Sequence, residues 1–147
     1  MKSSVKSLVL CTVMLSATQS FAHTSSDSTT GTLIKRVIAK AQFFSFSKQD
    51  SNAAYLNLGD AAMTAFTLQP AMDCFLANHM KDDLQVSYEI WEREREGKTV
   101  RVNNATRIVS LKTGDDTKNW AQKESGDAEM MKDHHEKLKE VRAGYLR

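Results

Sequence analysis

The sequence predicts a protein of the α+β class that is mainly β with helices. A long run rich in β-branched and aromatic residues begins at about Gly31, and a strictly alternating segment begins at Leu84. Two other stretches space their apolar residues three and four positions apart. Alternation is typical of a half-buried strand, and the wider spacing is typical of an amphipathic helix. Together these patterns predict three strands, a short helix, two strands and a C-terminal helix.

Residues 1–22 predict export from the cytoplasm. They contain a short positive region, an apolar run and small residues up to Ala22, which is the layout of a signal peptide. The apolar run is too short to cross a bilayer. We therefore expect a periplasmic or secreted mature chain that starts near His23 and has no membrane insertion. Residues 23–30 are rich in Ser and Thr and carry no apolar side chain, which predicts a disordered N-terminal arm.

The first strand is expected to be long and bent, because apolar residues between Gly31 and Phe46 occupy positions of both parities. A turn over residues 48–52 leads to a short second strand at residues 54–58. A third strand is predicted over residues 63–68, where β-branched and aromatic residues again occur.

Two segments predict helices. Residues 71–80 predict a short amphipathic helix with Pro70 in its first turn, where proline is tolerated. Residues 128–142 predict a longer C-terminal helix with one apolar side. The segment between Gly114 and this helix is expected to be a polar loop. Trp120 in this loop is expected to anchor the C-terminal helix on the core, and the alternative is that it lines a ligand groove.

The alternating segment predicts one half of a long hairpin. Residues 84–96 form the first strand, residues 97–98 supply the turn, and residues 99–111 return as the second strand. A bulge is expected at residues 103–104. The tip of this hairpin is heavily charged.

The order of elements over residues 31–111 resembles the oligonucleotide/oligosaccharide-binding (OB) fold. The resemblance implies a small five-stranded OB-like barrel with a helix between strands 3 and 4. We therefore divide the mature chain into an OB-like β domain at residues 31–113 and a loop with a C-terminal helix at residues 114–147. A half-open β-sheet with two helices is the alternative architecture. The fold-level resemblance extends to secreted toxin B subunits, which bind cell-surface sugars, although this chain departs from many of them in lacking a disulfide.

Charge argues against a nucleic-acid partner. The chain has 20 Lys and Arg, but Lys2 and Lys6 lie in the predicted signal peptide, which leaves 18 against 18 Asp and Glu. Nucleic-acid binding draws most of its affinity from an excess of cations. A neutral mature chain gives no such excess.

The hairpin carries the candidate binding residues. An aromatic platform flanked by guanidinium groups suits stacking on a carbohydrate, an anionic sugar or a partner peptide. We expect this ligand-binding face to consist of Tyr88, Trp91, Arg93, Arg95 and Arg107.

A plainer interpretation treats the same hairpin as a solubilising device. Three glutamates alternate with two arginines over residues 92–96, so alternation places the acids on one face and the arginines on the other. Lys98 and Arg101 can form ion pairs with them across the hairpin. Such charges also block pairing at a sheet edge.

Cys74 is the only thiol of the predicted mature chain, so no intramolecular disulfide can form there. Helical geometry places Cys74 about 200° from Met72, away from the apolar stripe. We expect it to face solvent or another element. An intermolecular disulfide, and thus a homodimer through Cys74, is one interpretation, and packing against the C-terminal helix is the other.

No catalytic motif or metal-ligand spacing occurs, and we expect no cofactor and no metal. His79 is interpreted as a core histidine with a hydrogen bond to backbone, and His134 and His135 point about 100° apart on a helix. We therefore expect an exported small binding module for a partner protein or an envelope or cell-surface glycan, and no enzyme. The alternatives are a small periplasmic enzyme, such as a metal-dependent hydrolase using these histidines, and a structural subunit of an envelope assembly.

Overall fold

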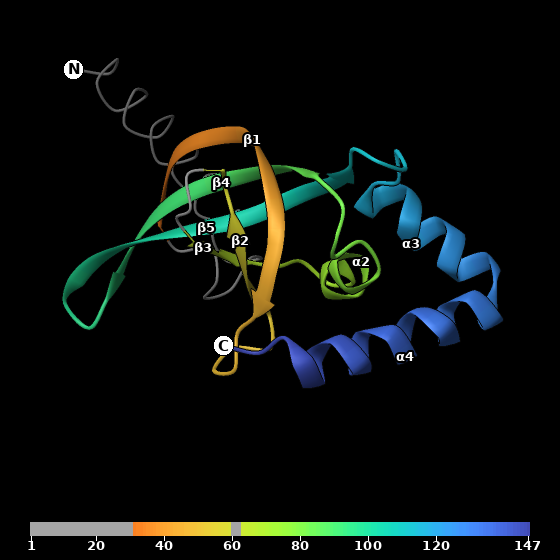
Figure 1. The fold of residues 1–147 in the computed structure, drawn as a ribbon. Coiled ribbons are helices and arrows are strands. Elements are labelled where there is room, and N and C mark those ends of the chain that lie inside the picture. The colour runs from red at the N-terminus through yellow and green to blue at the C-terminus, as the bar shows by residue number, and fades with distance from the viewer. Residues whose placement is uncertain (1–30, 60–62) are drawn as a thin grey trace, which may run out of the picture. The chain divides into compact units, whose positions relative to one another are not determined.

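The computed structural model describes residues 31–59 and 63–147 (Figure 1). The predicted signal peptide and N-terminal arm lie outside the described residues. Within the described part, Leu33–Arg147 forms one compact unit.

The sheet is built from five strands in the described part of the chain, and the α+β class is confirmed. In sequence order they are β1 (Thr32–Phe46), β2 (Ala53–Asn57), β3 (Met63–Thr67), β4 (Leu84–Arg95) and β5 (Lys98–Ser110). Their order in space is β1-β2-β3-β5-β4, and the sheet closes into a ring. β3 pairs with β5 in parallel, whereas the β1–β2, β2–β3 and β4–β5 pairs are antiparallel.

Near its end, β1 changes from burying odd-numbered positions to burying an even-numbered one, as the two-sided apolar pattern predicts. Ala41 and Phe43 are buried and Phe44 is exposed, so the odd positions face the core there. The register with β2 then shifts between Phe43 and Ser45, and Phe46 becomes fully buried. An extra residue of this kind bends a strand and strengthens its twist. β1 therefore supplies core side chains from positions of both parities.

The β4–β5 hairpin turns one residue earlier than expected. Its two turn residues are Glu96 and Gly97, with φ of 53° and 77°. A two-residue hairpin turn of this type needs positive φ at both central positions, so the turn includes Glu96 and leaves Lys98 as the first residue of β5.

The predicted bulge at Asn103 and Asn104 is wrong. Both asparagines pair regularly with β4, and the register instead shifts near the root of the hairpin, where Thr106 is the extra residue of β5. Because of this extra residue, Ala105 and Ile108 both face the core although they are three positions apart. Because a bulge is fixed by which face of each strand must be buried, an asparagine pair alone does not locate it.

Three helices complete the described part: α2 (Met72–Asn78), α3 (Thr117–Gly126) and α4 (Ala128–Gly144). α2 and α4 confirm the two predicted helices. α2, however, begins after Ala71, which has a φ of 73°, so Pro70 precedes the helix instead of lying in its first turn. None of the helices in the described residues is long and apolar enough to cross a membrane.

α3 replaces most of the loop expected between Gly114 and α4. Its sequence lacks an apolar stripe, and Trp120 is buried on an otherwise polar helix. Trp120 contacts Phe75 of α2 at 5.5 Å between ring centroids and stacks on His134 of α4 at 3.9 Å. The expectation that Trp120 anchors the C-terminal helix on the core is confirmed, although it does so from a helix.

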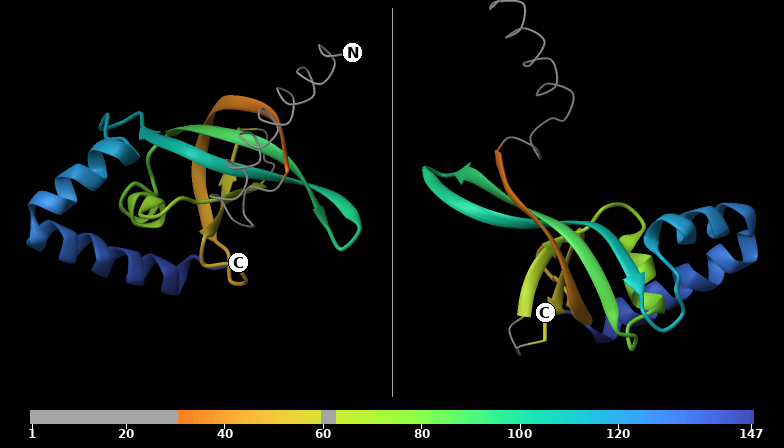
Figure 2. Two further views of the ribbon diagram at one scale, coloured as in Figure 1. Left: turned by 180° about the vertical axis from the view of Figure 1, so that it is seen from behind. Right: turned by 90° about the horizontal axis from the view of Figure 1, so that it is seen from above.

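The core lies inside the ring and under the helices. Its largest fully buried side chains include Phe46, Phe66 and Phe75, and Trp120 and Val141 of the C-terminal segment join the same cluster. In Figures 1 and 2 the closed end of the β4–β5 hairpin and the pair α3–α4 lie at opposite ends of the sheet. The helices therefore leave the hairpin tip uncovered.

Candidate functional site

Strand alternation divides the hairpin into two chemically different faces. In β4, Leu84 and Val86 point into the core, so the positions between them point outward. Trp91, Arg93 and Arg95 follow on this outer side. Their partners on β5 are Val102, Val100 and Lys98. We call this set the basic face, and it consists of Trp91, Arg93, Arg95, Lys98, Val100 and Val102.

The opposite side of the same segment is the acidic face, which we define by Glu92 and Glu94. Arg101 lies across from Glu92 and donates from Nε to its carboxylate at 3.2 Å, which confirms the predicted cross-strand pairing for this residue. Thr99 Oγ1 donates to Glu94 at 3.2 Å. The acidic face is thus partly neutralised by its own hairpin.

The cations of the basic face have no such partners. Within residues 31–59 and 63–147, the side chains of Arg93, Arg95 and Lys98 make no hydrogen bond or ion pair. Nε of Arg93 is buried and has no acceptor. Lys98 stands opposite Arg95 and not opposite a glutamate, so its predicted pairing is wrong. Three positive charges therefore share one side of the hairpin.

The root of the basic face is held by a carboxylate that sequence reasoning missed. Glu89 accepts from Trp91 Nε1 at 3.2 Å and from Arg36 Nε of β1 at 3.0 Å. The indole of Trp91 is therefore fixed at its polar edge. Because Glu89 is already paired with Arg36, it does not compensate the positive charge of Arg93, Arg95 and Lys98.

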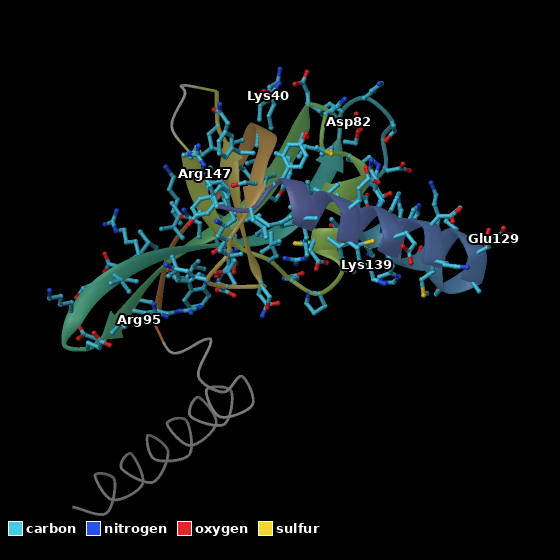
Figure 3. All side chains as sticks on the ribbon, turned by 60° about the horizontal axis from the view of Figure 1, so that its bottom comes forward. Lys40, Asp82, Arg95, Glu129, Lys139 and Arg147 are labelled. Carbon is cyan, nitrogen blue, oxygen red and sulfur yellow. The ribbon has the colours of Figure 1, made fainter. Side chains whose placement is uncertain are left out.

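The five predicted binding residues do not form one platform. Tyr88 is 8% exposed and packs edge-on against Phe66, with ring centroids 4.8 Å apart, because its position in β4 faces the core. Arg107 faces outward near the hairpin root, where it donates to Asp116 at 2.6 Å and lines a separate cavity of about 340 Å³. Trp91, Arg93 and Arg95 remain together, as Figure 3 illustrates for Arg95 near the hairpin end.

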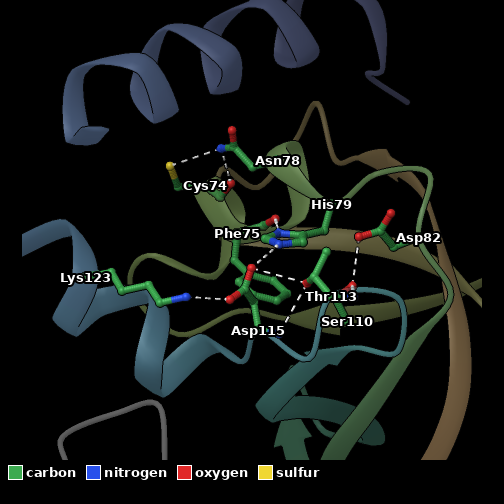
Figure 4. A network of polar contacts seen from close by, with 9 residues as sticks. All are labelled: Cys74, Phe75, Asn78, His79, Asp82, Ser110, Thr113, Asp115 and Lys123. Carbon is green, nitrogen blue, oxygen red and sulfur yellow. Dashed lines mark hydrogen bonds and ion pairs between the residues drawn. The ribbon is translucent and has the colours of Figure 1, made fainter. Parts of the chain in front are cut away.

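A second polar cluster surrounds His79 (Figure 4). The ring is 5% exposed; Nδ1 lies 2.8 Å from the carbonyl oxygen of Phe75, and Nε2 lies 3.3 Å from Oδ2 of Asp115. The expected core histidine with a backbone hydrogen bond is confirmed. Both ring nitrogens face acceptors, so only the doubly protonated ring can donate to both.

Asp115 connects this histidine to α3. Its carboxylate accepts from Lys123 Nζ at 2.7 Å and from Thr113 Oγ1 at 3.2 Å. The hydrogen bond from the Lys123 ammonium, followed by that from His79, lowers the pKa of Asp115 below its ordinary value. The sequence does not reveal this partner, because 36 positions separate Asp115 from His79.

The neighbouring Asp116 is the second carboxylate with a lowered pKa. The backbone N–H of Asn119 donates to it at 2.7 Å and is the main cause, and the Arg107 guanidinium adds to the effect. Asp116 thereby accepts the N–H of Asn119 in the first turn of α3 and joins that turn to β5.

His134 and His135 make contacts inside the helical layer. His134 stacks on Trp120, and His135 Nδ1 lies 2.8 Å from the carbonyl oxygen of Met131 in its own helix. In the described residues, no group of three or more His, Cys, Asp and Glu is arranged to hold a metal ion.

Cys74 is expected from the sequence to face either solvent or another element of the fold. It is 2% exposed, so it is buried against another element. Asn78 Nδ2 lies 3.7 Å from the Cys74 sulfur and also donates to the carbonyl oxygen of His134 in α4 at 3.3 Å. The intermolecular disulfide remains a prediction, and it would require α4 to move away from α2.

The fold and the site define the chain as an α+β protein with a ring-shaped sheet and a charged hairpin. No family model, curated protein or solved structure matches this chain.

Proposed function

We propose that this chain is an exported, OB-like binding module that recognises a partner protein or an envelope glycan through the basic face of its β4–β5 hairpin. The observation that carries the proposal is the sorting of charge across the hairpin. On one face Arg101 pairs with Glu92 and Thr99 donates to Glu94. On the other face Arg93, Arg95 and Lys98 have no hydrogen-bond or ion-pair partner among the described residues. Arginine and tryptophan are the side chains that most often dominate binding energy at interfaces.

Two further features support the proposal. The spatial strand order β1-β2-β3-β5-β4, with α2 between β3 and β4 in the chain, is the arrangement expected of an OB-like barrel. The N-terminal sequence pattern supports export to the periplasm or beyond.

The enzyme alternative has less support from the geometry. His79 is enclosed between Phe75 and Asp115, and the ring of His134 is covered by Trp120. A general base has to reach the proton it removes, and these two rings are occupied by contacts within the fold.

The test is capture from an envelope extract by the mature protein starting at His23, with eluates analysed for protein and for sugar. The informative variant is Arg93→Ala/Arg95→Ala, and the matched control is Lys132→Ala/Lys139→Ala, which removes two exposed cations from α4. Figure 3 shows Lys139 on α4 and Arg95 near the hairpin end. We expect the hairpin variant to lose the captured species and the control to keep them; equal capture by both would contradict the proposal.

A further inference from the structure

We infer that the basic face binds an acidic, extended segment of a partner protein that carries an apolar side chain next to its acidic ones. This inference rests on the proposed function and names the chemistry of the partner. Three observations carry it: the excess charge, the spacing of the cations along β4, and the apolar residues at the root of the face.

Charge defines the sign of the partner. Among residues 31–59 and 63–147, no acid pairs with Arg93, Arg95 or Lys98 on this side of the hairpin, and Nε of Arg93 is buried without an acceptor. An unsatisfied buried N–H costs free energy that a hydrogen bond would recover. A carboxylate that binds the edge of the guanidinium accepts from Nε and a terminal nitrogen together, once the side chain turns toward it.

Spacing defines the conformation of the partner. Alternate residues of a strand lie roughly 6.6 Å apart, so Arg93 and Arg95 present their charges at the repeat of alternate side chains in another extended chain. Lys98 lies across from Arg95 and adds a second cation at the same level. Carboxylates at two alternate positions of an extended peptide therefore meet both arginines at once.

The apolar half of the face defines the rest of the pattern. Trp91 is paired with Val102, and Val100 stands opposite Arg93; all three side chains are half-buried. They lie on the hairpin-root side of Arg95 and Lys98. A partner segment that follows β4 thus places an apolar residue over Trp91 and acidic residues over the cations.

A protein segment fits this surface better than a glycan. A pair of strands presents a flat face, and cavities in the described part, such as the one lined by Thr113, Asn119 and Lys123, lie elsewhere. Small ligands are usually held in concave sites. Adaptable side chains on a flat face, with arginine and tryptophan prominent, are typical of a protein interface.

The test uses a short labelled peptide in which isoleucine and two glutamates occupy alternate positions, separated by threonines. Fluorescence anisotropy measures its affinity for the mature protein, with the lysine-for-glutamate peptide and polygalacturonate as comparison probes. The variants are Arg93→Glu/Arg95→Glu and the charge-matched control Lys132→Glu/Lys139→Glu. Arg93→Lys/Arg95→Lys keeps the charges in place and guards against misfolding as an explanation.

We expect the acidic peptide to bind the wild-type protein. Its affinity should fall at least about tenfold for the variant Arg93→Glu/Arg95→Glu and should be unchanged for the helix control Lys132→Glu/Lys139→Glu. The lysine variant should retain most of the affinity, and added salt should weaken binding, since these charges are exposed. Equal affinity in the hairpin variant, binding of polygalacturonate without the peptide, or binding of neither probe would overturn the inference. If extract capture still depends on Arg93 and Arg95 in that case, the proposed function stands and only the partner class is wrong.

Discussion

His79 Nε2 lies 3.3 Å from the Asp115 carboxylate, which joins the end of α2 to the loop that enters α3. The ring is buried and its other nitrogen faces the carbonyl oxygen of Phe75, so each ring nitrogen has an oxygen neighbour within the fold. Lys123 binds the same carboxylate from α3. This histidine and aspartate therefore connect the helical layer to the end of β5.

Replacing Asp115 with Asn should destabilise the fold by about 1–3 kcal/mol, because it removes charge-assisted hydrogen bonds to His79 and Lys123. Urea unfolding of the wild type and the variant measures the difference in the free energy of unfolding. Asp133→Asn is the control, since Asp133 is exposed on α4. A loss as large in the control would contradict the assigned role of Asp115.

Stability should fall in acid because of Asp115 and Asp116. The pKa of each carboxyl is lowered in the folded state, first by Lys123 for Asp115 and by the Asn119 N–H for Asp116. The folded state therefore favours the charged form of each carboxyl. Its contribution to the free energy of unfolding is present above the ordinary pKa of about 3.9. It is lost as the pH falls from about 4 through the lowered values.

Urea unfolding at a series of pH values between about 6 and about 2 checks this dependence. The double variant Asp115→Asn/Asp116→Asn should show a shallower loss of stability in acid than the wild type. An identical slope for the two proteins would show that other carboxyls control acid unfolding.

Removing Tyr145 to Arg147 should destabilise the end of β1. Phe46 N–H donates to the Tyr145 carbonyl at 2.8 Å, Arg147 N–H donates to the Phe46 carbonyl at 2.9 Å, and Lys48 N–H donates to the Arg147 carbonyl at 2.9 Å. Loss of the three bonds should cost about 1–3 kcal/mol and speed hydrogen exchange at the Phe46 amide. Leu146→Ala, which keeps the backbone bonds, should leave that exchange slow; fast exchange in this control would assign the effect to side-chain packing.

Trp120→Ala should be among the most damaging single changes, at about 3–5 kcal/mol, because the indole fills space between α2 and α4. Trp120→Phe, which keeps a ring there, should lose less. Thermal unfolding followed by circular dichroism compares the two. Equal loss in both variants would mean that the size of the indole is not what holds α3 in place.

The Cys74 thiol should react slowly with an aromatic disulfide reagent in the native protein and rapidly in urea, since it is 2% exposed. The rate of thiol release measures its accessibility. The variant Asn78→Ala removes the amide that contacts both Cys74 and α4, and it should increase the native rate. Native labelling as fast as in urea would contradict the burial and would favour the disulfide-linked dimer.

The sequence by itself determined the elements whose side chains carry a period. Alternation from Leu84 predicts β4, the two-sided apolar pattern up to Phe46 predicts a bent β1, and the spacing of apolar residues predicts α2 and α4. It also placed the glutamates and arginines of the hairpin tip on opposite faces, because a strand has a period of two wherever it lies.

Tertiary structure alone decided which residues meet. α3 carries no apolar stripe, and its position depends on one buried indole that rings from α2 and α4 surround. Tyr88 was assigned to the binding face but belongs to the core, since the facing of a strand position depends on which side is covered. The Asp115 partner of His79 and the Arg36 partner of Glu89 come from distant segments. Local patterns specify periodicity, whereas contacts between distant segments follow from how the elements pack together.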